Sequence, residues 1–137
     1  LVGDDTNQPL SVSGTLSGGT STLIVLGQIT GGTTVTLPGG AVYHNLTLTP
    51  SAAETYAFAS AATLTGTLTL NDADATLTPT TGNGVTALGV DISNGAIDLN
   101  TNAGTISTRD YTQSGGTLDT DDGSTSVTIT GAAASTV

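Results

Sequence analysis

Strict alternation over Ala62–Leu70 is the sequence feature that most constrains the fold. Ala, Leu or Gly occupies every second position of this segment, and Thr occupies each position between them. Because successive side chains of a strand point to opposite faces of a sheet, the pattern predicts a strand with one apolar and one hydroxyl face. Thr also favours extended backbone over helix, since its branched Cβ restricts χ1. The segment therefore indicates an all-β protein.

Related segments recur at a step of about 20 residues, the length of one coil in many repeat proteins. Short runs of similar sequence begin at Gly66, Gly95, Gly104 and Gly116, and Gly95 and Gly116 are 21 residues apart. Two or three short strands with glycine at the corners, where positive φ is needed, are what one solenoid coil requires. Apolar residues at steps of 18 to 22 residues are expected to stack in one core column: Leu48, Leu68, Val90, Tyr111 and Ile129.

We therefore predict a single-stranded parallel β-solenoid with coils of about 20 residues, forming one domain over residues 1–137. Residues 41–131 carry the repeat-like coils, and residues 1–40 form a less regular N-terminal part. The alternative is an antiparallel β-sandwich, because short strands about every ten residues suit that fold as well. Hairpin signals are sparse, since Asn-Gly occurs only at residues 83–84 and 94–95, and this favours the solenoid.

The charge balance excludes nucleic acid as a partner. Eleven acidic residues stand against one basic residue among Lys and Arg, which is Arg109, and the net charge is −10. Such a chain cannot neutralise a phosphate backbone, and anionic membrane surfaces are disfavoured for the same reason. No apolar run approaches the roughly 20 residues of a membrane helix, so we expect no membrane insertion. The absence of Cys rules out disulfides, thiolate catalysis and Cys-ligated zinc.

The densest acidic cluster is Asp119, Asp121 and Asp122, directly before Gly123. Ca²⁺ takes six to eight oxygen ligands, and a turn with closely spaced Asp supplies several of them. One interpretation is a Ca²⁺ site that fastens a corner, and the other is a solvated acidic turn. The cluster lacks the terminal Glu of an EF-hand loop. No other cofactor is expected.

No catalytic residue is predicted. The strand carboxylates are expected to point outward and, where they stack, to repel one another unless cations bridge them: Asp91, Asp98, Asp110 and Asp119. The chain has no Trp and a single Arg, so it lacks the groups that usually hold a sugar beside a glycosidase carboxylate pair. His44 is the only His and is expected to make a hydrogen bond at a corner or in the core. Asn45 begins the one Asn-x-Thr sequon and is the candidate for glycosylation.

Several stretches resemble the rungs of exported bacterial repeat proteins. They are Tyr43-His-Asn-Leu-Thr-Leu, Thr55-Tyr-Ala-Phe, Leu64-Thr-Gly-Thr-Leu-Thr-Leu, Asp110-Tyr-Thr-Gln-Ser-Gly-Gly-Thr-Leu-Asp and Ser126-Val-Thr-Ile-Thr-Gly. These are similar to β-solenoid proteins of the filamentous-haemagglutinin-like and autotransporter-like class of surface adhesins and fibres. The resemblance covers about residues 41–131. It implies a parallel, right-handed solenoid that is secreted or at the cell surface and has a binding or scaffolding role.

We expect a structural or adhesive extracellular module, specifically a self-associating subunit or segment of a cell-surface fibre, sheath or adhesin stalk. The ends of a solenoid expose unpaired strand edges, and residues 131–137 show no charged or helical cap, which predicts end-to-end stacking or strand exchange between copies. Alternatives are a carbohydrate- or surface-binding adhesin domain and an ice-binding protein, the latter suggested by the Thr face of residues 62–70. An enzyme is not expected.

Overall fold

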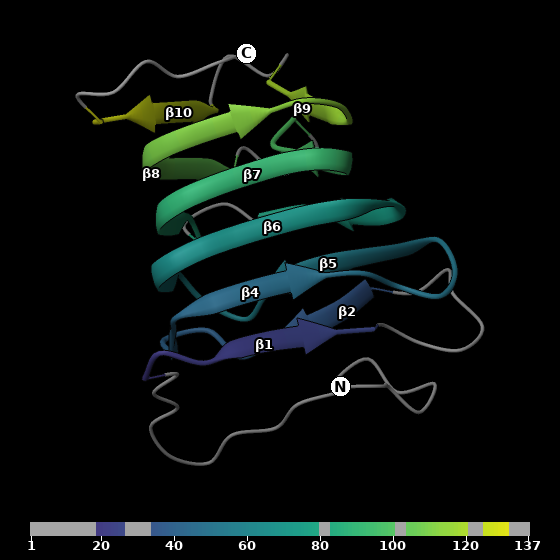
Figure 1. Ribbon diagram of the computed structural model, residues 1–137, viewed down its shortest axis with the longest axis horizontal. Coiled ribbons are helices and arrows are strands. Elements are labelled where there is room, and N and C mark those ends of the chain that lie inside the picture. Colours follow the sequence, from purple (N-terminus) through teal and green to yellow (C-terminus); the bar gives the residue numbers. More distant parts are fainter. Residues whose placement is uncertain (1–18, 27–33, 80–82, 101–103, 121–124, 132–137) are drawn as a thin grey trace.

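The described part of the chain consists of ten strands, and every pairing between them is parallel (Figure 1). The computed structural model describes residues 19–26, 34–79, 83–100, 104–120 and 125–131. The strands are β1 (Thr22–Val25), β2 (Thr34–Leu37), β3 (Val42–Tyr43), β4 (Asn45–Leu48), β5 (Glu54–Phe58), β6 (Ala62–Leu77), β7 (Val85–Asp98), β8 (Thr105–Gln113), β9 (Thr117–Asp119) and β10 (Ser126–Ile129). The parallel solenoid is therefore confirmed, and the antiparallel sandwich is wrong.

The strands wind around the core on three faces. The first face stacks β3, the starts of β6, β7 and β8, and β10. The second stacks β1, β4, the middle of β6 and β7, and the end of β8. The third stacks β2, β5, the ends of β6 and β7, and β9. In Figure 1 the second face runs left to right in front and the chain returns behind it one level higher, so the winding is right-handed.

One column of residues shows how the coils register. Leu23, Leu46, Leu68, Val90 and Tyr111 pair in succession on the second face, so neighbouring coils differ by 21 to 23 residues. This agrees with the predicted coil length. It also shows that β1, which lies in the segment predicted to be less regular, stacks in the same register as the coils above it.

The predicted core column was wrong at its two ends. Leu48 pairs with Leu70, and Ile129 pairs with Thr108 on a different face. Coil length varies, because register shifts interrupt the pairing of β6 with β7 at three places. Steps counted along the sequence therefore lose the true register wherever a coil gains or loses a residue.

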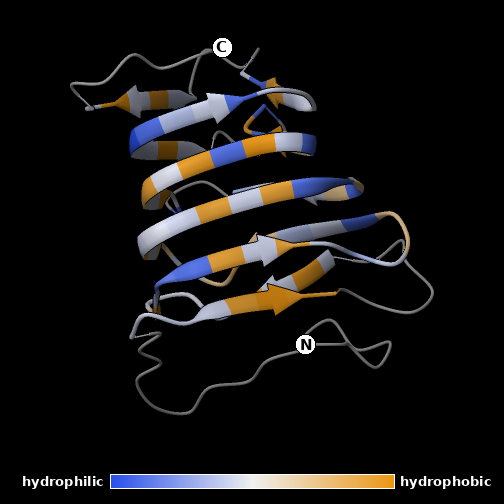
Figure 2. Ribbon diagram, viewed as in Figure 1, coloured by the Kyte–Doolittle hydropathy of each residue, from blue (hydrophilic) through white to orange (hydrophobic). Residues whose placement is uncertain are grey.

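The alternation over Ala62–Leu70 is matched residue by residue in the burial of β6. Within residues 62–70, the Ala, Leu and Gly residues are buried, and the Thr residues are exposed or half-buried. Figure 2 shows the same bands of hydrophobic and polar residues along the neighbouring strands. Burying each Leu contributes about 1.5–3 kcal/mol, so the stacked aliphatic columns are the main stabilising feature of the solenoid.

Two of the four repeated glycines lie at corners and have positive φ. Gly95 and Gly116 have φ of 83° and 66°, and they follow the second face where the chain turns toward the third. A Cβ on Gly95 would lie 2.5 Å from the carbonyl oxygen of Asp72. Gly66 and Gly104 are not among the positive-φ residues, so the expectation of positive φ was wrong for those two.

Candidate functional site

The C-terminal end of the solenoid carries an incomplete apolar layer. Val127 and Leu118 pair with the buried residues Ile106 and Ile97, so they point inward, yet each is only partly buried. Ile129 pairs with the buried residue Thr108 and is 41% exposed. We call Leu118, Val127 and Ile129 the C-terminal rim.

At this end of the solenoid, backbone N–H groups of β10 point outward, away from the coil below. Within the described residues, β9 pairs only with β7, and β10 pairs only with β8. The N–H of Ser126 donates to the Gly104 carbonyl and that of Thr130 to the Thr108 carbonyl. Because polar groups alternate in direction along a parallel strand, the N–H groups of Val127 and Ile129 point away from β8.

Among the strand carboxylates, only one predicted stack forms. Asp98 and Asp119 are direct partners on adjacent coils of the third face, and both are half-buried. Asp91 instead lies between Thr69 and Thr112. Directly opposed like charges destabilise a sheet, so the Asp98–Asp119 stack is an electrostatic weak point.

The predicted calcium cluster lies partly outside the described residues. Asp119 ends β9, whereas Asp121 and Asp122 fall in the range that the structure does not describe. Within the described ranges, no three His, Asp or Glu side chains gather closely enough to hold a metal ion. The calcium site at Asp119, Asp121 and Asp122 stays a prediction.

Asn45, the glycosylation candidate, connects three coils. Its Nδ2 donates to the Thr22 hydroxyl at 3.3 Å, and its Oδ1 accepts from the Thr67 N–H at 2.9 Å. The absence of a side chain on Gly66 leaves room for this contact, because a Cβ there would collide with the Asn45 side-chain oxygen. Sequence reasoning missed this role, and the available signal was that Gly66 follows Asn45 by about one coil length. Glycosylation of Asn45 stays a prediction.

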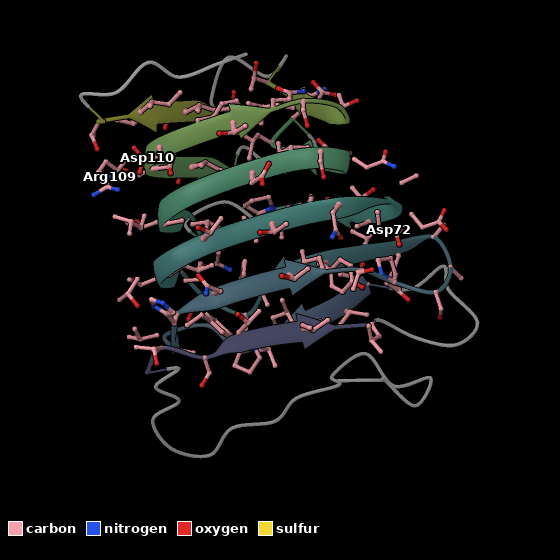
Figure 3. The ribbon with its side chains drawn as sticks, in the orientation of Figure 1. Asp72, Arg109 and Asp110 are labelled. Carbon is pink, nitrogen blue, oxygen red and sulfur yellow. The ribbon has the colours of Figure 1, made fainter. Side chains whose placement is uncertain are left out.

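A buried carboxylate at the corner between the second and third faces was also missed. Glu54 is 3% exposed and shares the inward face of β5 with the fully buried Tyr56. Burial first, and then the negative charges of Glu54 and Asp72, raise the pKa of Tyr56. The Tyr56 hydroxyl has no hydrogen-bond partner among the described residues. Asp72, which Figure 3 labels, accepts a hydrogen bond from the Thr49 hydroxyl at 3.4 Å. The sequence signal for the burial of Glu54 was the strict alternation of inward positions from Phe58 through Tyr56 to Glu54.

A column of side chains that we call the corner column lies at the edge between the first and second faces. The strand registers place one residue of each coil in this column. In order along the solenoid they are His44, Thr65, Leu88, Arg109 and Thr130. His44 Nδ1 lies 3.1 Å from the Thr65 hydroxyl, which agrees with the expected hydrogen bond at a corner. Arg109 Nε and Nη2 donate to Asp110 Oδ2 at 2.9 and 2.6 Å, and this bond raises the pKa of Arg109 (Figure 3).

A second column runs beside it on the first face. Thr63, Thr86, Ser107 and Thr128 pair in succession, and we call them the hydroxyl column. Between the two columns lies a surface groove of about 260 Å³, which has Thr86 and Ser107 on one side and Thr65, Leu88, Arg109 and Thr130 on the other.

The Thr rows do not form one regular array. On the second face Thr47, Thr69 and Thr112 share a column with Asp91, and the neighbouring column passes from Thr67 to Gly89 and Asp110. A flat array that orders water needs the same hydroxyl pair on every coil. This geometry gives the ice-binding interpretation no specific support.

Comparisons of this chain with models of protein families, with curated proteins and with solved structures gave no match. The described part of the chain contains no helix with the length and apolar character of a membrane span.

Proposed function

We propose that this protein is a structural module of an extracellular fibre, sheath or adhesin stalk that associates end to end with copies of itself. The observation that carries the proposal is the C-terminal rim, where inward-pointing aliphatic side chains stay partly exposed. An added coil would bury Leu118, Val127 and Ile129 as the coils below bury their own aliphatic residues. Such burial is worth about 25 cal/mol for each Å² of apolar surface.

The backbone at the same end favours a strand as the partner. The N–H groups of Val127 and Ile129 point away from β8, in the direction in which the solenoid would continue. A parallel strand from a second copy would extend the ladder with the geometry that the other faces already use. A head-to-tail contact of this kind repeats without closing, and therefore builds a filament.

Charge sets the condition for assembly. Each copy carries a net charge of −10, so two copies repel one another at low ionic strength. Added salt shortens the range of that repulsion to about 8 Å at physiological ionic strength. We therefore expect assembly to increase with salt and with divalent cations. The extracellular location is part of the proposal and is supported by the rung-like stretches and the strongly acidic composition.

The test compares two single substitutions at neighbouring positions of β10. Ile129→Lys places a charge on the apolar rim, whereas Thr128→Lys places the same charge on the exposed outer face. Light scattering and negative-stain electron microscopy at rising protein concentration, with and without Ca²⁺, would follow assembly. Circular dichroism would verify that both variants fold.

We expect filaments from the unchanged protein and from Thr128→Lys, and monomers from Ile129→Lys. A protein that stays monomeric at high concentration with Ca²⁺ would contradict end-to-end association. A closed dimer that does not grow would contradict the filament role, because it would mean that two like ends cover one another.

A further inference from the structure

We propose that the groove between the corner column and the hydroxyl column binds a neutral linear saccharide that lies along the solenoid axis, across the coils. The groove lies on the side of the solenoid, and the C-terminal rim lies at its end. The inference is therefore separate from end-to-end association, and either can fail without the other.

The groove offers hydroxyl groups at a regular spacing. Thr86 and Ser107 are partners on adjacent coils, so their hydroxyls repeat at the distance between paired strands, about 4.8 Å. A side-chain hydroxyl both donates and accepts hydrogen bonds, which suits it to the hydroxyls of a sugar. A row of such groups along the axis favours a linear chain of sugars over a compact ligand.

Arg109 and Asp110 place donors and acceptors side by side at this edge. The guanidinium has five N–H donors, and Nε and Nη2 both donate to one carboxylate oxygen, Asp110 Oδ2. The side chains of Arg109 and Asp110 are 56% and 45% exposed, so solvent or a ligand reaches both. Adjacent N–H donors and carboxylate acceptors match adjacent hydroxyls on a sugar ring.

Leu88 adds an apolar surface between the polar groups. It lies next to Arg109 in the corner column and is 41% exposed, although most large aliphatic residues of the solenoid are buried. One face of a sugar ring is mostly C–H groups, and packing that face on Leu88 would remove apolar surface from water.

Charge favours a neutral ligand over an acidic one. The protein carries a net charge of −10, and the Asp110 carboxylate already neutralises the only Arg. An acidic saccharide would meet repulsion from the protein as a whole and would have to compete with Asp110 for Arg109.

The experiment begins with the full chain on a glycan array that holds neutral and acidic saccharides. Cello-, chito- and malto-oligosaccharides would then be titrated singly by calorimetry. Arg109→Gln, Leu88→Ser and Thr86→Val alter the groove. Thr69→Val is the matched control, because Thr69 is an outward Thr on the second face. Melting temperatures would verify that each variant is folded.

We expect at least one neutral oligosaccharide to bind, with affinity at least about tenfold lower in the groove variants and unchanged in Thr69→Val. Lack of binding to every neutral glycan would overturn the inference. Binding to acidic glycans only, or equal binding by folded groove variants and control, would overturn it as well. Filament formation by Thr86→Val would show that a loss of binding is not a loss of assembly.

Discussion

The two ends of the solenoid differ in how completely they cover their inward-pointing aliphatic side chains. At the N-terminal end, Val25, Val35 and Leu37 are 0% exposed. At the C-terminal end, Val127 and Leu118 are only partly buried, and Ile129 is 41% exposed. All six residues belong to strands that pair on one side only within the described ranges. Strand pairing alone therefore does not decide whether an end is closed.

The difference indicates that the solenoid has a direction. In a stack of coils, each coil is covered mainly by its two neighbours, so exposure of the inward face identifies an end that lacks a neighbour. Here that exposure is larger at the C-terminal end, although Leu23 at the N-terminal end is also only partly buried. We infer that the two ends contribute unequally both to stability and to association.

The largest expected effect comes from truncating a Leu at each end. Leu37→Ala should lower the free energy of unfolding by about 2–5 kcal/mol, because Leu37 is fully buried and its removal leaves a cavity. Leu118→Ala should cost much less, because part of that side chain already contacts water. Urea unfolding of both variants measures the difference. Equal losses would show that the two ends are equally closed.

A smaller effect is expected from the Asn that connects three coils in the N-terminal half. Asn45→Ala leaves the Thr67 N–H without its hydrogen bond and should cost about 1–3 kcal/mol. The next coils of the same column carry Thr67, Gly89 and Asp110, so the bridge is not repeated toward the C-terminal end. Asn71→Ala, at an exposed position, is the control and should change stability by less than about 0.5 kcal/mol.

Alkaline pH should destabilise the protein through its buried tyrosines. Burial raises the pKa of Tyr43 to about 12 from an ordinary value of 10.0, and burial also raises the pKa of Tyr111. Both phenols hold their protons more tightly in the folded state. Stability is therefore full below about pH 10 and falls as the pH rises toward 12. Denaturant unfolding at several alkaline pH values measures this loss. If Tyr43→Phe loses as much stability at alkaline pH as the unchanged protein, the loss arises from other groups.

The smallest effect concerns the stacked carboxylates near the C-terminal end. Asp98→Asn removes the repulsion between Asp98 and Asp119 and should stabilise the protein by about 0.2–1 kcal/mol. The gain should shrink as salt is added. Thermal melting with added Ca²⁺ and with a chelator, in both proteins, also tests the predicted calcium site. A melting temperature unchanged by chelation would remove the calcium interpretation.

Much of the fold followed from local patterns. The period of two over Ala62–Leu70 predicted which side chains of β6 are buried, because a strand has no freedom to turn consecutive side chains to the same face. The predicted coil length agreed with the structure, because Gly95 and Gly116 mark successive corners. Both adopt the positive φ that a glycine tolerates.

The register and the surface sites did not follow from the sequence. Spacing placed Ile129 above Tyr111, but the coils vary in length, and Ile129 pairs with Thr108. The contact of Asn45 with Thr67 and the column shared by His44 and Arg109 join residues that lie one or more coils apart. Single-residue differences in coil length decide such contacts, and no local pattern records them.

The sequence by itself determined that this chain is all-β and favoured coils of about 20 residues, because alternation and corner glycines act within one coil and need no distant partner. Only the tertiary structure decided how the coils are aligned, which side chains share a column and which inward-pointing side chains stay partly exposed. Those properties arise when separate coils pack together, and the exposure of Ile129 at the C-terminal rim is their clearest result.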